Sequence, residues 1–190
     1  FYWNDTVQKT FCVVMSGNYT INSKNSASTT NFISFKSAVS QLMCSGINGA
    51  VVFDVSADTF TEQVEIGVVN GVSSTNTITF IGHGVDSTIL TFSGSAAAPH
   101  TLRLSSSKYV TFRDMGIQAS SGSNAWAVNI LNSSFNKFAK CKIECSGSAA
   151  TATGTNFAAL VINGNATTIN SAGSNDANYI DSNIIIGGYY

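Results

Sequence analysis

Charged residues and proline are scarce in this 190-residue chain. Only 10% of the residues are charged, nine basic residues nearly balance ten acidic ones, and there is one proline. Because Lys and Arg are scattered, the sequence has no basic field to attract phosphates, which argues against nucleic-acid binding. No apolar run reaches the roughly 18 residues of a membrane helix, so no membrane insertion is expected.

Short neutral polar residues take the place of the missing charges. Ser, Thr and Asn make up about a third of the chain, alongside 16 Gly, and this composition favours strands and turns. Only residues 34–45 have helical periodicity, because Phe35, Val39 and Leu42 recur at three- and four-residue steps before Gly46. The chain is therefore expected to be all-β with one short helix.

The segments after this helix alternate between apolar and polar residues, as strands with one buried face do. The predicted strands are residues 51–55, 61–66, 77–81, 89–92, 101–104, 109–117, 127–131, 135–143, 159–162 and 179–186. Turns rich in Gly, Ser and Asn separate them. Residues 146–155 and 163–175 are longer polar stretches and are predicted to be loops.

Apolar pairs on these strands recur at spacings typical of a solenoid. One series begins at Val51, Ile78, Leu102, Val128 and Leu160, and a second at Val110, Asn136 and Asn178. A single turn of such a coil cannot bury its inward face alone, so the turns must stack. We expect a right-handed parallel β-helix, with an N-terminal cap at residues 1–48 and coils at residues 49–190.

The second series places Met115, Cys141 and Asn183 in one inward column, where Cys141 would be a buried thiol and Asn183 would need amide partners. In the same alignment Asp114 lies one coil from Lys140, about 4.8 Å away, which predicts an ion pair between coils. Arg113 and Asp114 are neighbours on one strand, so their side chains should point to opposite faces.

Several stretches resemble a known group of proteins. Residues 35–42, 46–55, 59–66 and 76–80, followed by residues 107–117, are similar to the cap and first coils of β-helix regions in large surface proteins of Bacteroidota. This resemblance, within the pectin-lyase-like superfamily, implies export by the type IX secretion system and a role as an adhesin or gliding-associated surface protein. It implies an extracellular or cell-surface location.

Candidates for catalysis are few. Residues 60–64 resemble a stretch near the start of pectin methylesterases, but the Asp-containing motif of their later strands is missing, so Glu62 is expected to be structural. His83, Asp86 and His100 are the candidates for acid–base or metal chemistry, and Arg113 is the candidate for a lyase base. We predict no catalytic residues, no metal site and no cofactor; a polysaccharide lyase or esterase fragment is the alternative.

Four cysteines are present, without the paired spacing of a zinc site. Cys12 and Cys44 flank the cap, and they are expected to form a disulfide if the chain folds outside the cytoplasm. Trp126, Tyr189 and Tyr190 are the aromatic residues proposed to contact a ligand, by stacking on sugar faces.

The functional prediction is a non-catalytic module of a larger exported protein. It would contact a surface glycan or a protein partner through the loops at residues 146–155 and 163–175. The apolar stretch at residues 184–190 predicts coils that continue beyond this segment. A second alternative is a fibre subunit whose open coil ends stack on other copies.

Overall fold

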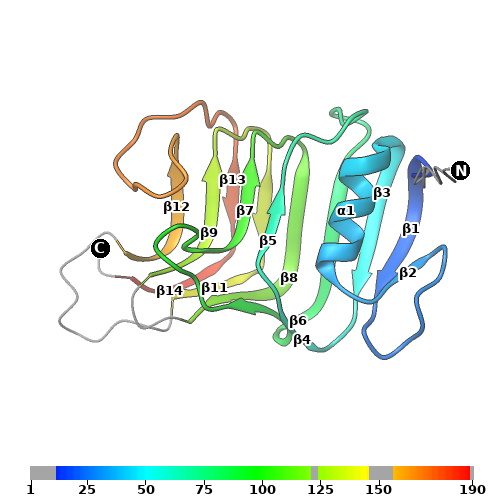
Figure 1. Ribbon diagram of the computed structural model, residues 1–190, viewed down its shortest axis with the longest axis horizontal. Helices are drawn as coiled ribbons and strands as arrows, with labels where there is room; N and C mark the ends of the chain where they lie inside the picture. Colours follow the sequence, from blue (N-terminus) through cyan, green and yellow to red (C-terminus); the bar gives the residue numbers. More distant parts are fainter. Residues whose placement is uncertain (1–11, 121–123, 146–155, 189–190) are drawn as a thin grey trace, which may run out of the picture.

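The computed structural model describes residues 12–120, 124–145 and 156–188, and it confirms a mostly β protein (Figure 1). Its strands form two sheets in which the strands pair in parallel. The first sheet contains β1 (Met15–Ile21), β2 (Asn31–Phe32), β3 (Ile47–Val55), β4 (Thr59–Thr61), β6 (Ile78–Phe92), β8 (Val110–Ala119), β10 (Lys137–Ala139), β11 (Lys142–Cys145), β13 (Tyr179–Asp181) and β14 (Ile184–Gly187). The second sheet contains β5 (Val64–Ile66), β7 (His100–Ser105), β9 (Ala125–Leu131) and β12 (Phe157–Asn163).

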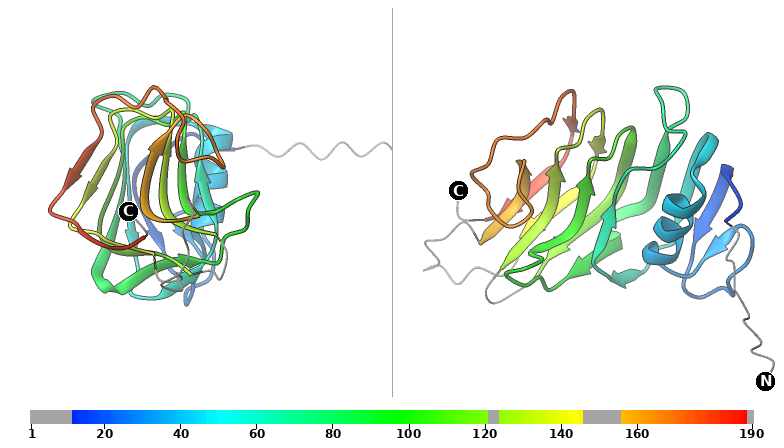
Figure 2. Two further views of the ribbon diagram at one scale, coloured as in Figure 1. Left: turned by 90° about the vertical axis from the view of Figure 1, so that its left-hand side faces the viewer. Right: turned by 45° about the horizontal axis from the view of Figure 1, so that its top comes forward.

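From β4 onward the chain passes alternately through the two sheets. The second sheet has the order β12-β9-β7-β5, and the main path of the first sheet runs β13-β10-β8-β6-β3-β1-β2. Each passage through both sheets, called a repeat below, therefore lies beside the next one. Seen along the long axis, the two sheets surround a common interior (Figure 2).

Stacked phenylalanine rings run through this interior. Phe53, Phe80, Phe112 and Phe138 occupy one register position on β3, β6, β8 and β10. Their ring centroids are 4.8, 4.7 and 5.5 Å apart, and neighbouring rings are within 13° of parallel. All four side chains are fully buried, so each repeat contributes one ring to a column that only neighbouring repeats can cover.

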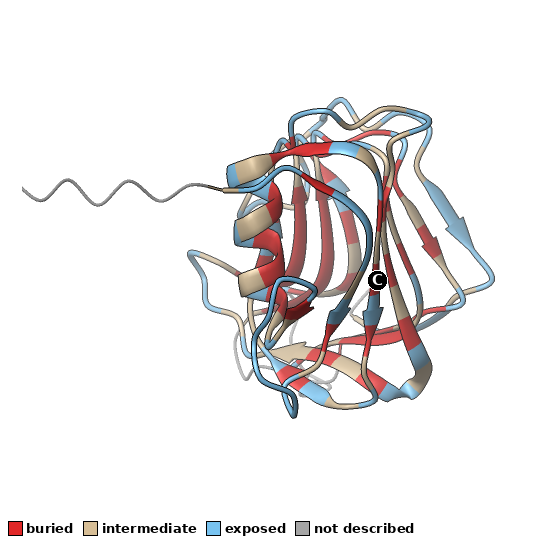
Figure 3. Cartoon of the chain, turned by 90° about the vertical axis from the view of Figure 1, so that its right-hand side faces the viewer, coloured by how far each residue is buried: buried red, intermediate tan, exposed pale blue. Residues whose placement is uncertain are grey.

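Helix α1 (Phe35–Ser45) packs against β5 and β1, and its buried face points toward the interior (Figure 3). Ser34 begins it, with a hydroxyl that accepts from Ser37 N at 3.1 Å. Gly46 ends it at a φ of 67°, in the left-handed region that glycine adopts readily. The predicted helix at residues 34–45 is therefore confirmed to within one residue.

Register pairing corrects one of the two predicted series. Val51 pairs with Ile78 in the first sheet, but Leu102 lies in the second sheet and pairs with Val64 and Val128. The predicted step from Ile78 to Leu102 therefore connected residues of two different sheets. Spacing along the sequence does not show to which sheet a strand belongs. The second series is confirmed, since Phe138 pairs with both Phe112 and Ile180.

Two local features also differ from expectation. Strands β1 and β2 precede the helix and extend the first sheet into the region predicted as cap. Gly82, His83 and Gly84 do not form a free turn but lie within β6, where the register shifts between Ile81 and Ile89. This bulge moves His83 toward β3. In the described part of the chain, no helix is long and apolar enough to cross a membrane.

Candidate functional site

The three candidates for acid–base chemistry lie in different environments. His83 Nε2 is 2.7 Å from Asp54 Oδ1, and both side chains are exposed. Asp86 lies on the same bulged strand but contacts Lys142, 3.2 Å from its Nζ. His100 is buried on β7. The structure therefore does not bring His83, Asp86 and His100 together into one site.

Lys142 lies between two carboxylates on the outer surface of the first sheet. Its Nζ is 3.2 Å from Asp86 Oδ1 and 3.3 Å from Glu144 Oε2. Hydrogen bonding to Asp86, and then to Glu144, raises the pKa of Lys142. Because the ammonium stays charged and contacts both acids, this cluster links β6 to β11 across the intervening strand β8.

His100 is only 3% exposed, and its Nδ1 has no hydrogen-bond partner. Burial, aided by the positive charge of Arg103, lowers the pKa of His100 to about 3. The imidazole is therefore neutral at physiological pH. Because it faces no described cavity, it is a buried structural side chain.

A buried polar network crosses the outer face of the second sheet. Arg103 Nε donates to Asn129 Oδ1 at 2.9 Å, and Arg103 Nη2 donates to Ala166 O at 2.6 Å. Asn129 Nδ2 continues the network to Asn163 Oδ1 at 3.0 Å. The half-exposed Glu65 lies 3.5 Å from Arg103 Nη1. Burial lowers the pKa of Arg103, and the charge of Glu65 opposes that shift.

This network attaches the loop at residues 164–178, which includes most of the polar stretch predicted as a contact loop. Asn163 Nδ2 donates to Thr168 O at 2.7 Å, and Asn175 Nδ2 donates to Asn163 O at 3.0 Å. The loop is thus fastened to the sheet while most of its residues stay exposed. The other predicted contact loop, at residues 146–155, lies outside the described residues.

Asparagine side chains at the ends of strands bond the backbone of the preceding repeat. Asn183 Oδ1 accepts from Cys141 N at 2.7 Å, and its Nδ2 donates to Phe138 O at 2.8 Å. Asn178 makes equivalent bonds to Asn136 N and Ser133 O. The amide of Asn183 therefore has the partners that its column position requires.

Asp114 and Lys140 do not form the ion pair expected from their alignment. Asp114 Oδ2 instead accepts from Arg113 Nη1 at 3.0 Å, and none of the ion pairs among the described residues joins Asp114 to Lys140. Asp114 and Lys140 both have left-handed backbones, with φ of 57° and 53°. This left-handed conformation interrupts the alternation of side chains along the strand. Arg113 and Asp114 therefore lie on the same face, whereas opposite faces were predicted.

The cysteines divide into a bonded pair and two buried thiols. Cys12 and Cys44 form a disulfide that ties the chain before β1 to helix α1. Cys141 and Cys145 are free and buried. Burial raises the pKa of the Cys141 thiol to about 11, so Cys141 is a poor nucleophile at neutral pH.

The predicted aromatic contacts require a correction. Trp126 is 1% exposed, because it lies on β9 between β7 and β12, where His100 and Ala158 are its register neighbours. It therefore cannot stack on a ligand at the surface. Tyr189 and Tyr190 lie outside the described residues.

The structure instead exposes an aromatic pair that the sequence analysis did not single out. Tyr109 and Phe135 stack with centroids 5.2 Å apart and planes 13° from parallel. Both precede β-strands of the first sheet, and Phe135 is 44% exposed. Their spacing of 26 residues equals the step between Val110 and Asn136, so this signal was present in the predicted series.

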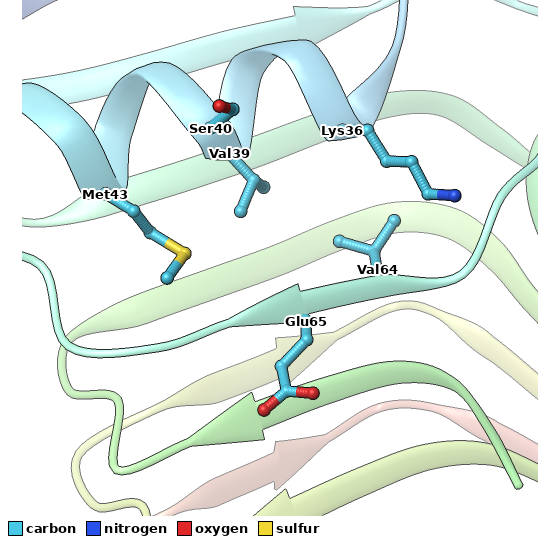
Figure 4. A pocket seen from close by; sticks show the side chains of 6 residues that line it. All are labelled: Lys36, Val39, Ser40, Met43, Val64 and Glu65. Carbon is cyan, nitrogen blue, oxygen red and sulfur yellow. The ribbon is translucent and has the colours of Figure 1, made fainter. Parts of the chain in front are cut away.

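A surface groove lies between α1 and β5, with a volume of about 310 Å³ (Figure 4). Its lining combines apolar and charged side chains: Lys36, Val39, Ser40, Met43, Val64 and Glu65. Glu65 is the only acid among them and lies near Arg103. The groove thus lacks a second carboxylate for glycoside cleavage by paired acids.

Metal binding and family membership complete the description. Among residues 12–120, 124–145 and 156–188, no group of three or more His, Cys, Asp or Glu side chains could hold a metal ion. Among known proteins, no family profile and no curated sequence matches the chain.

Proposed function

We propose that the two sheets form a right-handed parallel β-helix, and that the chain is a non-catalytic, structural and adhesive module of a larger exported protein. The observation that carries the proposal is the ring column of Phe53, Phe80, Phe112 and Phe138, which requires successive repeats to stack in register. Parallel strands joined by crossovers are right-handed in about 98% of cases. Such a rod presents surface residues at fixed spacings.

An extracellular or cell-surface location is supported by the disulfide between Cys12 and Cys44. Disulfides persist in oxidising compartments and are rare in the cytoplasm of most cells. The scarcity of charge and the abundance of exposed Ser, Thr and Asn suit a rod that stays soluble without a strong electrostatic field. This location agrees with the Bacteroidota surface proteins that the sequence resembles.

The adhesive role is supported by the fastened loop at residues 164–178. The Arg103 network and Asn175 hold its backbone, so an exposed surface is presented without a large ordering cost on binding. The partner would be a surface glycan or a protein. Several ion pairs, such as His83 with Asp54 and Lys137 with Asp181, join different strands, an arrangement suited to holding repeats together.

Two assays on the purified chain test this function together. Polysaccharides incubated with the protein should keep their length and their esters, measured by size-exclusion chromatography and by released methanol. The same polysaccharides, or intact cells, should retain the protein in a pull-down. Depolymerisation or ester release would support the lyase or esterase alternative, and a lack of binding to glycans and cells would remove the adhesive role.

Self-stacking is a second candidate function, because the last strands of the first sheet are exposed in the described part of the chain. Ile184, Ile185 and Ile186 on β14 are all exposed, as is Tyr179 on β13. These edge strands have further pairing capacity on their outer side. A second copy bound there would make the molecule dimerise or polymerise with concentration, which sedimentation velocity would detect.

A further inference from the structure

The stacked aromatic pair, of which Phe135 is exposed and Tyr109 half-buried, lies in one column where the chain enters the first sheet. Register pairing places Thr77 before Tyr109 in this column and Ala177 after Phe135. Two rings therefore stack between two short side chains. Ala177 ends at its Cβ and is exposed, and among the described residues no ring stacks on the face of Phe135 turned toward it.

Both aromatic residues adopt backbone conformations that bulky residues rarely use. Tyr109 has a φ of 57° and Phe135 a φ of 61°, which costs roughly 1 kcal/mol or more at each position. Ala177 occupies the same position in the next repeat, also with a left-handed φ of 52°. The corner can therefore be built without an aromatic ring, so the rings at 109 and 135 are not required by the fold.

Hydrogen bonds on either side of Phe135 hold it in this conformation. Asn136, fully buried, accepts from Val110 N at 3.0 Å and donates to Ser107 O at 3.1 Å. Ser134 Oγ accepts from Asp176 N at 3.0 Å. The ring is thereby presented in one orientation before any ligand arrives, which lowers the entropic cost of binding.

The chemistry beside the rings suits a ligand that has an apolar face and a polar rim. Lys137 Nζ lies 3.6 Å from Asp181 Oδ2 on the adjoining strands, and both side chains are about half exposed. Together they offer donors and acceptors with no net charge. Lys137 follows Phe135 by two residues, at the start of β10, so this polar pair begins close to the ring in the chain.

We propose that Phe135, backed by Tyr109, is a stacking subsite for a neutral saccharide. The polarised C–H groups of one sugar face would lie on the negative face of the Phe135 ring. Lys137 and Asp181 would hydrogen-bond hydroxyl groups at the edge of the same sugar. This inference rests on the proposed adhesive function, and it names a ligand class and a contact surface that adjoins the end of the loop at residues 164–178.

An array of immobilised neutral and acidic polysaccharides tests the subsite with the whole chain. The key variant is Phe135→Asn, because Asn removes the ring and tolerates a positive φ. Its thermal midpoint should equal or exceed that of the wild type, so lost binding would not reflect unfolding. Val68→Asn, which changes another exposed apolar side chain, is the matched control.

The expected result is binding of neutral polysaccharides that falls at least tenfold in Phe135→Asn and less than twofold in Val68→Asn. Phe135→Trp should retain or strengthen binding, because its ring is larger. Undiminished saccharide binding by Phe135→Asn would overturn the subsite and leave the adhesive function intact. If the wild type binds cells or a protein but no saccharide, the subsite is overturned and the partner is a protein. If the wild type binds no saccharide, no cell and no protein, both the subsite and the adhesive function are overturned.

Discussion

The two ends of the molecule are built differently. At the N-terminal end, α1 covers the interior, Phe35 is fully buried against Phe60 and Phe80, and a disulfide fastens the helix to the preceding chain. At the C-terminal end, Ile162 on β12 and Ile185 on β14 remain about half exposed. The same kind of side chain is therefore core or surface according to whether something lies beyond it.

The difference between the ends is largest for two residues that occupy the same register position on neighbouring strands. Ile143 and Ile185 are register partners on β11 and β14, yet Ile143 is fully buried and Ile185 is half exposed. Their strands differ in sequence, since Ile143 lies between Lys142 and Glu144 while Ile185 lies between two isoleucines, and the more apolar strand is the more exposed one. Burial in this architecture is thus a property of neighbouring repeats and not of the strand itself.

The largest expected effect is at the buried member of this column. Ile143→Ala removes a side chain packed between Ile117 and Ile185, and it should lower the free energy of unfolding by about 2–5 kcal/mol. Equilibrium denaturation in urea measures the loss. A loss below about 1 kcal/mol in the free energy of unfolding would contradict the prediction. It would mean that packing between two neighbouring strands does not make Ile143 more important for stability than Ile185.

The disulfide provides the next largest test, because it belongs only to the closed end. Cys12 and Cys44 are 32 residues apart, and closing a loop of this length stabilises the folded state by about 3.7 kcal/mol. Reduction should therefore lower the thermal midpoint of the wild type. The double variant Cys12→Ser/Cys44→Ser should have this lower midpoint without reductant, and adding reductant should not change it. Equal midpoints for the oxidised wild type, the reduced wild type and the double variant would show that the N-terminal end does not depend on the disulfide.

His100 tests the interior of the second sheet through pH. Since burial holds its pKa at about 3, and an unfolded histidine titrates near pH 6.5, only the unfolded chain gains the proton between these values. The contribution of neutral His100 to the free energy of unfolding should be fully present above about pH 6.5. As the pH drops toward 3, the free energy of unfolding should fall by up to about 1.4 kcal/mol per pH unit.

Two histidine variants isolate this effect. Urea denaturation of His100→Phe between pH 5 and 7 should give a flatter profile than the wild type, because the buried titratable group is gone. His83→Gln changes the exposed histidine paired with Asp54 and serves as the control. A wild-type slope that survives in His100→Phe would assign the pH dependence to another group.

Glu62 links the helix to the strands, and its removal should have a moderate effect. Its carboxylate accepts from Phe35 N at 3.1 Å and from Lys36 N at 2.9 Å, at the positive end of the helix dipole. Glu62→Ala should cost about 1 kcal/mol in the free energy of unfolding. Thr61→Ala, its exposed neighbour, should cost less than half as much in the same denaturation experiment.

Sequence periodicity predicted the elements better than their arrangement. The helix at residues 34–45 and the register of Phe112 with Phe138 were accessible, because residue type and spacing report which side chains share a face. The sheet to which Leu102 belongs could not be predicted from the sequence. Two faces of one coil carry the same alternation, and only three-dimensional pairing separates them.

The candidate contacts failed for a related reason. Trp126 was expected at the surface as an aromatic residue able to stack on sugars, but it is buried between neighbouring strands. Asp114 was expected to bond Lys140 because the two residues align on successive repeats; the alignment is right, but both backbones are left-handed and Asp114 bonds Arg113 instead. Backbone conformation at corners is set by hydrogen bonds between repeats, which a single strand does not reveal.

The smallest effect is expected at the open end. Ile185→Ala should change the free energy of unfolding of a monomer by less than about 1 kcal/mol, because half of the side chain is already in water. Urea denaturation beside Ile143→Ala makes the comparison at one register position. A cost equal to that of Ile143→Ala, at protein concentrations where sedimentation velocity detects a dimer, would mean that a second copy covers the end. In that case the difference between the two ends would hold for the isolated chain and disappear in the assembly.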